Sequence, residues 1–484
     1  MKIGLFIVAP ILAFLTACST TPPPKPIGPL PSPDQLAWHE DDVTMFVHFG
    51  MNTFTGLGTG HGDENPDTFN PTNLDCKQWA KVAKETGFKG MILVAKHHDG
   101  FCLWPTATTK HSVKYSKWEN GKGDVVRNLS NACKEEGIKF GVYCSPWDRS
   151  QKNYNTNKKA YTAFYRKQLT ELLSNYGPIY EMWFDGNRAM IDDWSSIIKV
   201  VRTLQPHAII KQGPRIKPIT EDARWVGNEF ALAPLNNWNV YPAPDQNSTE
   251  KRVWFPVECD PKTMSMWFWV DEDPTPLEEM LNNYYTSVGR GSVLLFNVPP
   301  NKEGRFSDAW VAHLKEFHNA LNTIFKTDLA QTATITATNE RSSEFSAEKA
   351  IDNDLQTYWA SEDGVTTATL TLTWKKPVTF NVIRMEEQIA LGQRIAKYKL
   401  ESWDATTSKW KTLNQGFTIG RRKLDRVPLC KTTRLRLTIL KARACPTIRT
   451  LGVYHDTLSP KKYFTPALAN FECDPKHRHR KAKK

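Results

Sequence analysis

Histidine, carboxylate and tryptophan residues directly follow several short apolar runs of this sequence. The runs are rich in β-branched and aromatic residues, which favour strands. A folded chain must desolvate polar groups that meet on neighbouring strands, so a repeated arrangement of this kind is difficult to explain by packing alone. The residues concerned are His48, His97, His98, Trp147, Asp185, Glu229 and Glu258.

Two of these carboxylates, Asp185 and Glu229, have surroundings that suit different chemical roles. Asp185 follows the apolar residues 182–184 and precedes Gly186, which leaves room for the close approach of a substrate. Glu229 ends a run that contains Trp225, an apolar neighbour that we expect to help keep the carboxyl group protonated. Cleavage of a glycosidic bond needs such a pair, one group as an anionic nucleophile and the other as a proton donor.

Other interpretations of these groups remain open. The two carboxylates could form salt bridges with Arg188 and Arg224 and take no part in catalysis. His97 and His98 could bind zinc, although adjacent residues at a strand end point in different directions and no third ligand stands at a fixed spacing. We therefore expect no metal ion in this site.

The apolar runs themselves predict the strands of a parallel barrel. Amphipathic helical patterns at 76–87, 125–137 and 161–177 separate several of them, and each pattern closes on a glycine suited to a helix C-cap. Strands that alternate with helices favour a parallel sheet, and eight strands over about 260 residues fit a closed (β/α)8, TIM-type barrel. The predicted strands are residues 45–50, 90–98, 139–147, 180–186, 208–213, 223–229, 253–260 and 292–300.

Two consequences follow for this barrel. The interval between the fifth and sixth strands is too short for a helix, so we expect the barrel to be irregular there. Functional groups of such barrels lie at the carboxyl ends of the strands, which is where the polar residues above stand.

A change of pattern after about residue 328 indicates a second domain. Runs with period-two alternation predict an all-β jelly-roll sandwich over 329–457, behind a catalytic domain over 34–328. Asp352, Asn353 and Asp354 could supply oxygen ligands to a structural Ca²⁺, or could only form a tight turn. The predicted strands are residues 332–338, 367–374, 380–388, 396–403 and 433–440.

The N-terminus has the pattern of a bacterial lipoprotein. Lys2 precedes an apolar run over 3–15, which is too short to span a bilayer and ends in Leu-Thr-Ala-Cys. This ending resembles a lipobox, which implies removal of residues 1–17, acylation of Cys18 and a Pro-rich tether over 18–33. We therefore expect a lipid-anchored protein of the cell envelope, periplasmic or on the cell surface. A plain signal peptide with an incidental cysteine is the alternative.

The net charge of +12 does not favour a nucleic-acid partner. Six basic residues stand within the last nine positions, in a tail that we place at 458–484, and such tails are usually solvated. The segment with the candidate site is instead rich in Asp, Glu, His and Trp. The chain also has 17 Trp and 14 Tyr, a content typical either of sugar recognition by aromatic stacking or of a Trp-rich core.

Several motifs together resemble glycoside hydrolase family 29, the retaining α-L-fucosidases. They include KHHDGFCLWP (96–105), YEMWFDG (180–186) and RWVGNE (224–229), and the resemblance runs from about residue 36 to 325. It implies Asp185 as the nucleophile and Glu229 as the acid/base. The GNE motif is similar to that of the subfamily that acts on α-1,3/4 linkages. The resemblance also implies contacts to fucose from His48, His97, His98, Tyr143, Trp147 and Trp267.

The sequence departs from this family pattern in two loops. Residues 55–58 replace a Glu-Trp pair that often grips the sugar, and Glu64 is the residue that could substitute for it. Residues 264–268 lack an arginine that often precedes an aromatic run. Both departures concern the specificity for the group beyond fucose and leave the hydrolytic pair intact. A retaining mechanism further predicts that the carboxyl groups of Asp185 and Glu229 lie about 5–6 Å apart.

The second domain also resembles a known module, and two other functions remain possible for the whole chain. Residues 345–361 resemble the opening motif of discoidin-like or family 32 carbohydrate-binding modules. The expected partner is a fucosylated oligosaccharide or glycoconjugate, and the expected reaction needs no cofactor. One alternative is a glycan-binding surface protein without activity, and another is a barrel glycosidase that acts on a different sugar such as α-galactose.

Overall fold

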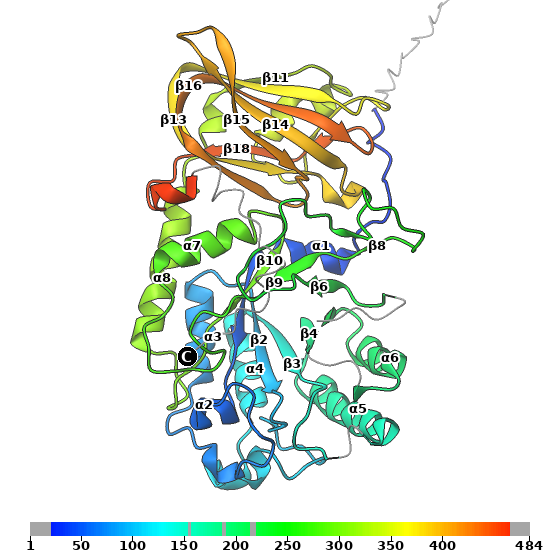
Figure 1. Ribbon diagram of the computed structural model, residues 1–484, viewed down its shortest axis with the longest axis vertical. Coiled ribbons are helices and arrows are strands. Elements are labelled where there is room, and N and C mark those ends of the chain that lie inside the picture. Colours follow the sequence, from blue (N-terminus) through cyan, green and yellow to red (C-terminus); the bar gives the residue numbers. More distant parts are fainter. Residues whose placement is uncertain (1–20, 153–155, 186–189, 213–218, 465–484) are drawn as a thin grey trace, which may run out of the picture.

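The computed structural model describes residues 21–152, 156–185, 190–212 and 219–464. Cys18, residues 1–20 and the part of the basic tail over 465–484 lie outside the described residues. The described chain forms a barrel domain and a β-rich domain that follow one another along the long axis of the molecule (Figure 1).

The first domain is a closed barrel of eight parallel strands, which confirms the predicted fold class. Every predicted strand contributes one barrel strand, although the seventh contributes only its second half. In spatial order the strands are β1 (Val43–Val47), β10 (Val293–Asn297), β9 (Val257–Cys259), β6 (Ala223–Trp225), β5 (Ile209–Gln212), β4 (Glu181–Phe184), β3 (Lys139–Cys144) and β2 (Gly90–Lys96).

The barrel is irregular after its fifth strand. β5 and β6 pair directly, and the described part of their connection, residues 219–222, contains no helix. The long connection from β6 to β9 carries only the antiparallel pair β7 (Val240–Tyr241) and β8 (Val253–Trp254). Regular helices therefore cover one side of the barrel, and loops lie along the other.

The outer helices include all three that the sequence predicts. Their N-cap side chains accept hydrogen bonds from the first-turn N–H groups, and α4 ends on Gly137, whose φ of 73° suits a residue without a Cβ. The predicted helices are α3 (Cys76–Glu85), α4 (Val125–Glu136) and α5 (Lys158–Asn175). The remaining helices are α1 (Pro33–His39), α2 (Met51–Thr55), α6 (Trp194–Leu204), α7 (Leu277–Thr286) and α8 (Asp308–Ile324).

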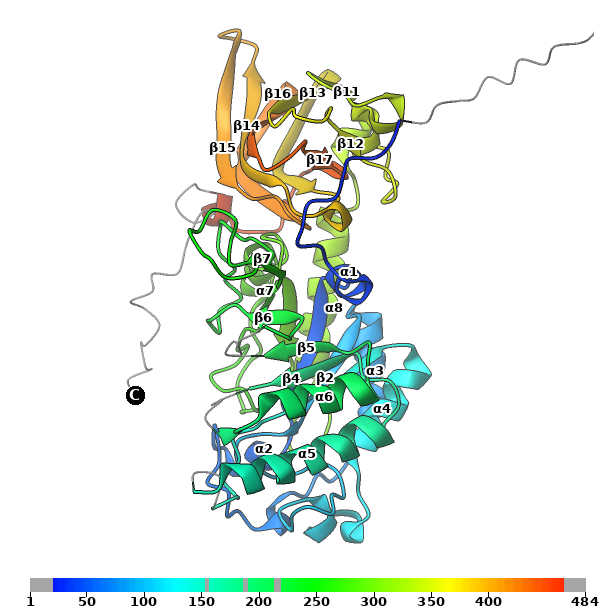
Figure 2. The ribbon, with the colours of Figure 1, turned by 90° about the vertical axis from the view of Figure 1, so that its right-hand side faces the viewer.

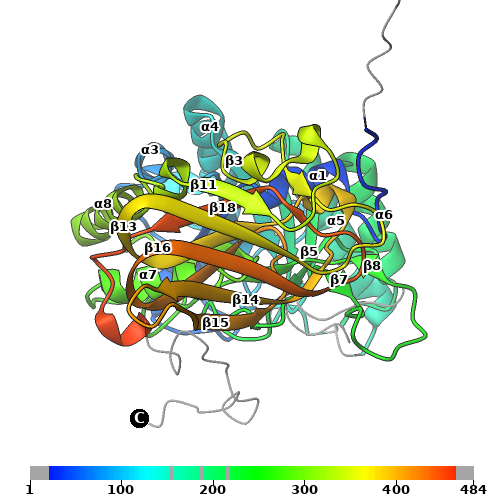
Figure 3. The ribbon, with the colours of Figure 1, turned by 90° about the horizontal axis from the view of Figure 1, so that it is seen from above.

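The second domain is an antiparallel all-β domain. Its main sheet has the order β11-β13-β16-β14-β15, and β18 pairs with β13. Figure 3 shows these long strands side by side above the barrel. The strands are β11 (Thr334–Ala337), β13 (Ala368–Glu386), β14 (Ile395–Asp404), β15 (Lys409–Phe417), β16 (Lys423–Ala442) and β18 (Thr450–Tyr454), with a separate pair of β12 (Trp359–Ala360) and β17 (Thr447–Ile448).

Asp352, Asn353 and Asp354 form a turn. Asp352 accepts the backbone N–H of Asp354 and the hydroxyl of Thr357, and Asn353 has a left-handed φ of 66°. Asp354 in turn accepts the backbone N–H of Gln356. The carboxylates are thus engaged by the turn, and the calcium ion remains a prediction.

The Pro-rich segment does not act as a free tether over its described residues. Figure 2 shows the chain from Thr21 to α1 lying along the second domain. Ile27 donates its N–H to the carbonyl of Leu391 at 3.0 Å, and Arg394 donates to the carbonyl of Lys25 at 2.7 Å. A side chain at Gly392 would collide with the Ile27 carbonyl, because a Cβ there would lie 2.0 Å from it. The described part of the segment is therefore bound to the second domain.

Arginines of the second domain hold it against the amino ends of the barrel strands. Arg421 lies 2.9 Å from Glu40 and 3.2 Å from Asp42, which precede β1. Arg449 joins Glu40 to the fully buried Glu386, with N–O distances of 2.9 Å to each. The carboxyl ends of the barrel strands consequently face away from the second domain.

Candidate active site

Asp185 lies directly beyond β4, where it is held among aromatic and imidazole groups. The Tyr143 hydroxyl on β3 donates to Oδ2 of Asp185 at 2.8 Å, and Nε2 of His98 lies 3.6 Å from the same oxygen. Burial, and then the Asp185 charge, raises the pKa of Tyr143 well above its usual range, so the hydroxyl keeps its proton. The Asp185 side chain is still 34% exposed, and a substrate can therefore reach it.

A serine fixes the proton of His98. The Ser145 hydroxyl donates to the Trp147 carbonyl at 2.9 Å, so its oxygen accepts from Nδ1 of His98 at 2.7 Å. Burial lowers the pKa of His98, although the Asp185 carboxylate opposes this effect. The ring is then neutral with its proton on Nδ1, and Nε2 is an acceptor on the side of Asp185. A hydroxyl group of a ligand could donate to it there.

His48 is oriented in the same way by an amide. Its Nδ1 donates to Oδ1 of Asn297, the last residue of β10, at 2.8 Å, and the Asn297 amide donates to the Trp267 carbonyl at 2.9 Å. The His48 ring stacks on Trp267 with 4.9 Å between the centroids. Burial lowers the pKa of His48 to about 3, so this ring is also neutral. Asn297 thus positions a histidine and an aromatic side chain together.

His97 and Trp147 complete this cluster. The His97 ring is buried beside Tyr143, with 5.9 Å between the centroids, and burial lowers its pKa well below the usual range. Trp147 packs against the other face of the site, 4.8 Å from the His98 ring, and the Arg149 guanidinium lies 4.8 Å from the Trp147 ring. The structure therefore brings six predicted residues of the substrate pocket and Asp185 into one group.

Glu258 lies below this group, not in it. Its carboxylate is fully buried in the barrel, where it accepts from the Trp183 indole at 3.0 Å and pairs with Lys211 at 3.0 Å. The Lys211 ammonium also lies 3.5 Å from the Trp183 ring centroid. Because the Glu258 and Lys211 side chains have no exposed surface, Glu258 supports the floor of the site and does not face a substrate.

Glu229 lies four residues beyond β6, which only β5 separates from β4 in the barrel. Its side chain is 43% exposed, and one carboxylate oxygen lies 3.6 Å from the ammonium of Lys262. The Lys262 N–H also donates to the Glu229 carbonyl at 3.3 Å. Arg224, offered above as a salt-bridge partner, directs its guanidinium at the carbonyls of Phe255 and Trp238, and Arg188 lies outside the described residues.

The structure does not favour the sugar contact predicted for Glu64. Its carboxylate accepts the backbone N–H groups of His61 and Gly62 and lies 3.8 Å from Nε2 of His111, and only 7% of the side chain is exposed. These contacts stabilise the loop after β1, because they satisfy N–H groups that the turn leaves open. The Glu64 carboxylate therefore stabilises the loop in which it stands.

Sequence reasoning missed four residues that shape the site, namely Ser145, Asn297, Asp260 and Lys262. Asn297 and Asp260 stand at strand ends, the same signal that identified the histidines. Ser145 and Lys262 act through contacts with residues distant in the sequence, which no local pattern indicates.

No group of three or more His, Cys, Asp or Glu side chains is placed to hold a metal ion in the described part of the chain. The same residues contain no helix long and apolar enough to cross a bilayer. All seven described cysteines are free thiols.

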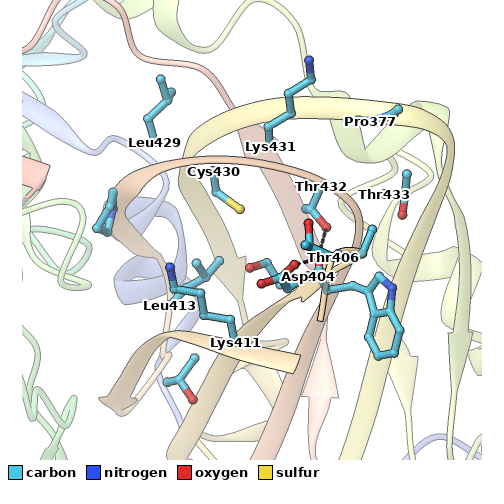
Figure 4. A pocket seen from close by; sticks show the side chains of 15 residues that line it. Pro377, Asp404, Thr406, Lys411, Leu413, Leu429, Cys430, Lys431, Thr432 and Thr433 are labelled. Atoms are coloured by element: carbon cyan, nitrogen blue, oxygen red, sulfur yellow. Dashed lines mark hydrogen bonds between the residues drawn. The ribbon is translucent and has the colours of Figure 1, made fainter. Parts of the chain in front are cut away.

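A separate hollow of about 560 Å³ lies in the second domain, between β14, β15 and β16 (Figure 4). Asp404 is the one carboxylate among its lining residues, and it accepts the backbone N–H groups of Thr406 and Thr407. A single carboxylate engaged in a turn cannot supply the two groups of a glycosidase, so the barrel mouth is the candidate active site.

Comparisons with known proteins agree with this geometry. Residues 37–323 match the family model for α-L-fucosidase, and residues 334–449 match the F5/8 type C domain. The chain is 40% identical over 470 residues to α-L-fucosidase 1 of Arabidopsis thaliana, with 90% of each chain covered.

Solved structures give the same result. The GH29 fucosidase of Ruminococcus gnavus, in complex with fucose, matches with a TM-score of 0.82 and 29% identity, over 91% of this chain and 97% of that one. SpGH29 matches with a TM-score of 0.83 and 34% identity, over 90% of this chain and all of that one. The chain therefore belongs to the α-L-fucosidase family, glycoside hydrolases of family 29, and carries a discoidin-like F5/8 type C domain behind its barrel.

Proposed function

We propose that this α-L-fucosidase is a retaining exo-enzyme with Asp185 as its nucleophile and Glu229 as its acid/base. The observation that carries the proposal is the setting of Asp185, which the protonated Tyr143 hydroxyl holds at an accessible barrel mouth, next to the neutral His98 ring. The hydrogen bond from Tyr143 stabilises the carboxylate as an anion, the form that a nucleophile requires.

The reaction proceeds in two displacements. Asp185 attacks the anomeric carbon while the bond to the leaving oxygen breaks, and Glu229 transfers its proton to that oxygen. Glu229, now an anion, then takes a proton from water as the water attacks the anomeric carbon and releases Asp185. Each displacement inverts the anomeric carbon, so the α configuration is retained overall.

The neutral imidazoles suit the recognition of a sugar that carries no charge. Because burial keeps His48, His97 and His98 unprotonated, each offers a hydrogen-bond acceptor or donor to a hydroxyl group without the desolvation of a full charge. Trp267 and Trp147 add aromatic faces at two sides of the cluster, and these suit the apolar face of a pyranose ring. These features suit an uncharged sugar such as fucose and support the proposed function.

We further propose α-1,3/4-linked fucose as the substrate, from the position of Glu229 in its GNE motif. The two loops that depart from the family pattern meet at the mouth, since a Cβ at Gly58 would lie 3.7 Å from the end of the Met266 side chain. These loops are in a position to contact the sugars beyond fucose, and the group next to fucose is where the specificity of this enzyme should differ.

A substrate comparison tests the proposed function. The purified full-length protein should hydrolyse an aryl α-L-fucoside and release fucose from a branched, Lewis-type oligosaccharide, and it should leave an aryl α-galactoside intact. Asp185→Ala should abolish all turnover, while Asp404→Ala in the second domain should not change it. Binding of the oligosaccharide without release of fucose would support the non-catalytic glycan-binding alternative.

We also propose a lipid anchor at Cys18, which lies outside the described residues. The short apolar run and the Leu-Thr-Ala-Cys ending support it. The protein would then reside in the bacterial cell envelope, with the second domain next to the point of attachment.

A further inference from the structure

The strand register of the barrel places Trp225 and Asp260 on the inner face of neighbouring strands. Trp225 on β6 pairs with Glu258 on β9, and residues paired across two strands point to the same face of the sheet. That face is the barrel interior, because Glu258 contacts Trp183 and Lys211 there. Asp260 follows Glu258 by two residues, so its side chain returns to the same face one level nearer to the mouth.

The two side chains are joined by a short hydrogen bond. The Trp225 indole N–H donates to Oδ1 of Asp260 at 2.6 Å. Asp260 is 4% exposed, whereas Trp225 is half-buried, so a buried carboxyl group holds the polar edge of a partly accessible indole. An indole has a single N–H donor, and this bond therefore sets how the ring lies across the mouth.

The segment after β9 also contacts Glu229 at a second place. Lys262, two residues beyond Asp260, donates its N–H to the Glu229 carbonyl at 3.3 Å and places its ammonium 3.6 Å from the Glu229 carboxylate. The two strand ends are thus linked twice, once through Trp225 and once through Glu229, which stands four residues after Trp225.

We propose that Asp260 is a positioning residue of the active site, which holds the Trp225 indole as the wall of the sugar pocket on the side of Glu229. The proposal rests on the proposed function only in that it names the pocket a fucose pocket. It assigns a role to a third carboxyl group of the mouth besides the nucleophile and the acid/base.

The protonation of Asp260 makes the role measurable. Burial raises the pKa of Asp260 to about 8, and its charged neighbours are Lys211 from β5, which opposes the shift, and Glu258 from β9 and Asp185 from beyond β4, which add to it. At pH 6 the group is therefore a neutral carboxylic acid with an accepting oxygen. An asparagine side chain has the same shape and the same acceptor, and it does not titrate.

Single and double variants of the full-length enzyme test the proposal at pH 6 with an aryl α-L-fucoside. D260N should keep kcat/KM within about threefold, since the amide oxygen still accepts from Trp225, whereas D260L should lose about tenfold or more because the indole donor is left without a partner. In a W225F background, D260L should cost little more, because the donor is already absent. D245L is the matched control, since Asp245 accepts from the Trp238 indole at 3.4 Å outside the mouth.

The indole N–H resonance of Trp225, identified by its absence in W225F, supplies a readout that does not depend on activity. It should shift with a midpoint near pH 8 in the wild type and stay fixed in D260N. The proposal is overturned if D260L keeps the wild-type kcat/KM, if the losses of W225F and D260L add, or if the resonance does not titrate. An inactive wild type with a titrating resonance would refute the fucosidase function and leave the positioning contact intact.

Discussion

Tyr143 and His98 approach the same oxygen of Asp185, but they act on it differently. The tyrosine hydroxyl donates a hydrogen bond at 2.8 Å, which stabilises the anion before substrate binds. His98 is neutral and presents an accepting nitrogen 3.6 Å away, too far for a direct bond. A hydroxyl of the sugar can bridge this gap, since it can donate to His98 while the anomeric carbon lies near Asp185.

The role of Glu229 is best tested by the leaving group. Glu229→Ala should reduce the glycosylation rate strongly for a natural oligosaccharide and only slightly for an aryl fucoside with a good leaving group, which needs little protonation. Deglycosylation should remain slow for want of a base, and added azide should rescue it with formation of α-fucosyl azide, because azide displaces Asp185 from the β-linked glycosyl-enzyme with a second inversion. Single-turnover rates on both substrates give the comparison. Equal losses of the glycosylation rate for both would show that Glu229 is not the acid.

Single residues differ in how far the sequence could predict them. His48, His97, His98 and Asp185 were found because each follows an apolar run, and strand ends meet at the mouth of a barrel. Their partners were not, because Asn297 lies 249 positions from His48 and an amide is not unusual at a strand end. Glu229 and Glu258 look alike in sequence, and only the depth at which their strands end separates an accessible carboxylate from a buried one.

At the scale of elements, a buried ion pair and a hydrogen bond connect the ends of β2 and β3 to α5. Lys96 at the end of β2 lies 2.9 Å from Asp148 and 2.8 Å from the Gln168 amide oxygen on α5, and neither Lys96 nor Asp148 is exposed. Burial by itself would lower the pKa of Lys96, but the attraction of Asp148 outweighs it and raises the pKa. Lys96 is therefore charged, and its contact with Asp148 fixes the segment that carries Trp147 in the wall of the site.

Lys96→Met should consequently destabilise the protein far more than an exposed pair would. It leaves the Asp148 charge buried without its partner, which typically costs about 3–5 kcal/mol. Lys77→Met is the control, because Lys77 and Glu135 form a pair with 76% and 56% of their side chains exposed, worth about 0–1 kcal/mol. Urea unfolding of both variants measures the difference. Similar midpoints would mean that the buried pair is screened or dispensable.

The elements of the barrel were easier to predict than those of the second domain. The barrel strands are buried on both faces and read as continuous apolar runs. In the second domain two predicted strands, 367–374 and 380–388, form the single strand β13, because an irregularity in the register between Thr373 and Val378 carries the chain through Lys375, Lys376 and Pro377. β15 was missed because its residues alternate poorly and are largely exposed.

The whole molecule depends on the contact between its domains, where His39 at the end of α1 is buried. It accepts from the Trp254 indole at 3.2 Å. Burial, followed by repulsion from Arg421 and Arg449 of the second domain, lowers the pKa of His39 to about 3. The unfolded chain therefore binds a proton below pH 6.5 that the folded protein does not bind until about pH 3. The contribution of His39 to the free energy of unfolding is therefore fully present above pH 6.5 and is lost as the pH falls from 6.5 to about 3.

His39→Gln should make the protein less sensitive to acid. The glutamine oxygen can still accept from Trp254, but the side chain does not titrate, so the loss of unfolding free energy between pH 6 and pH 4 should shrink by about 1.4 kcal/mol per pH unit. Urea unfolding at several pH values measures this slope. His207→Gln is the control, because the His207 side chain is 85% exposed and should leave the slope unchanged. An unchanged slope in His39→Gln would contradict the prediction.

The contacts of the N-terminal segment with the second domain determine how a lipid anchor would orient the enzyme. The Thr21 N–H donates to Glu344 at 3.0 Å, and Arg341 donates to the Pro22 carbonyl at 2.7 Å, so the chain is held on the second domain three residues after Cys18. Three residues span at most about 10 Å, which keeps an acylated Cys18 close to that domain. β1 runs from α1 beside the second domain to α2 at the far end of the molecule, and the barrel mouth opens there (Figure 1).

We therefore predict that the anchored enzyme directs its active site away from the bilayer. Cys18→Ser should move the protein from the membrane fraction to the soluble fraction, and Cys430→Ser, in the second domain, should not. Since anchor and mouth lie at opposite ends, kcat/KM on a soluble aryl α-L-fucoside should be the same for the membrane-bound wild type and the released variant. A fucosylated lipid in the same vesicle should be cleaved much more slowly by the bound form than by the soluble one. Unchanged fractionation of Cys18→Ser would refute the anchor, whereas efficient cleavage of the lipid by the bound form would refute the orientation alone.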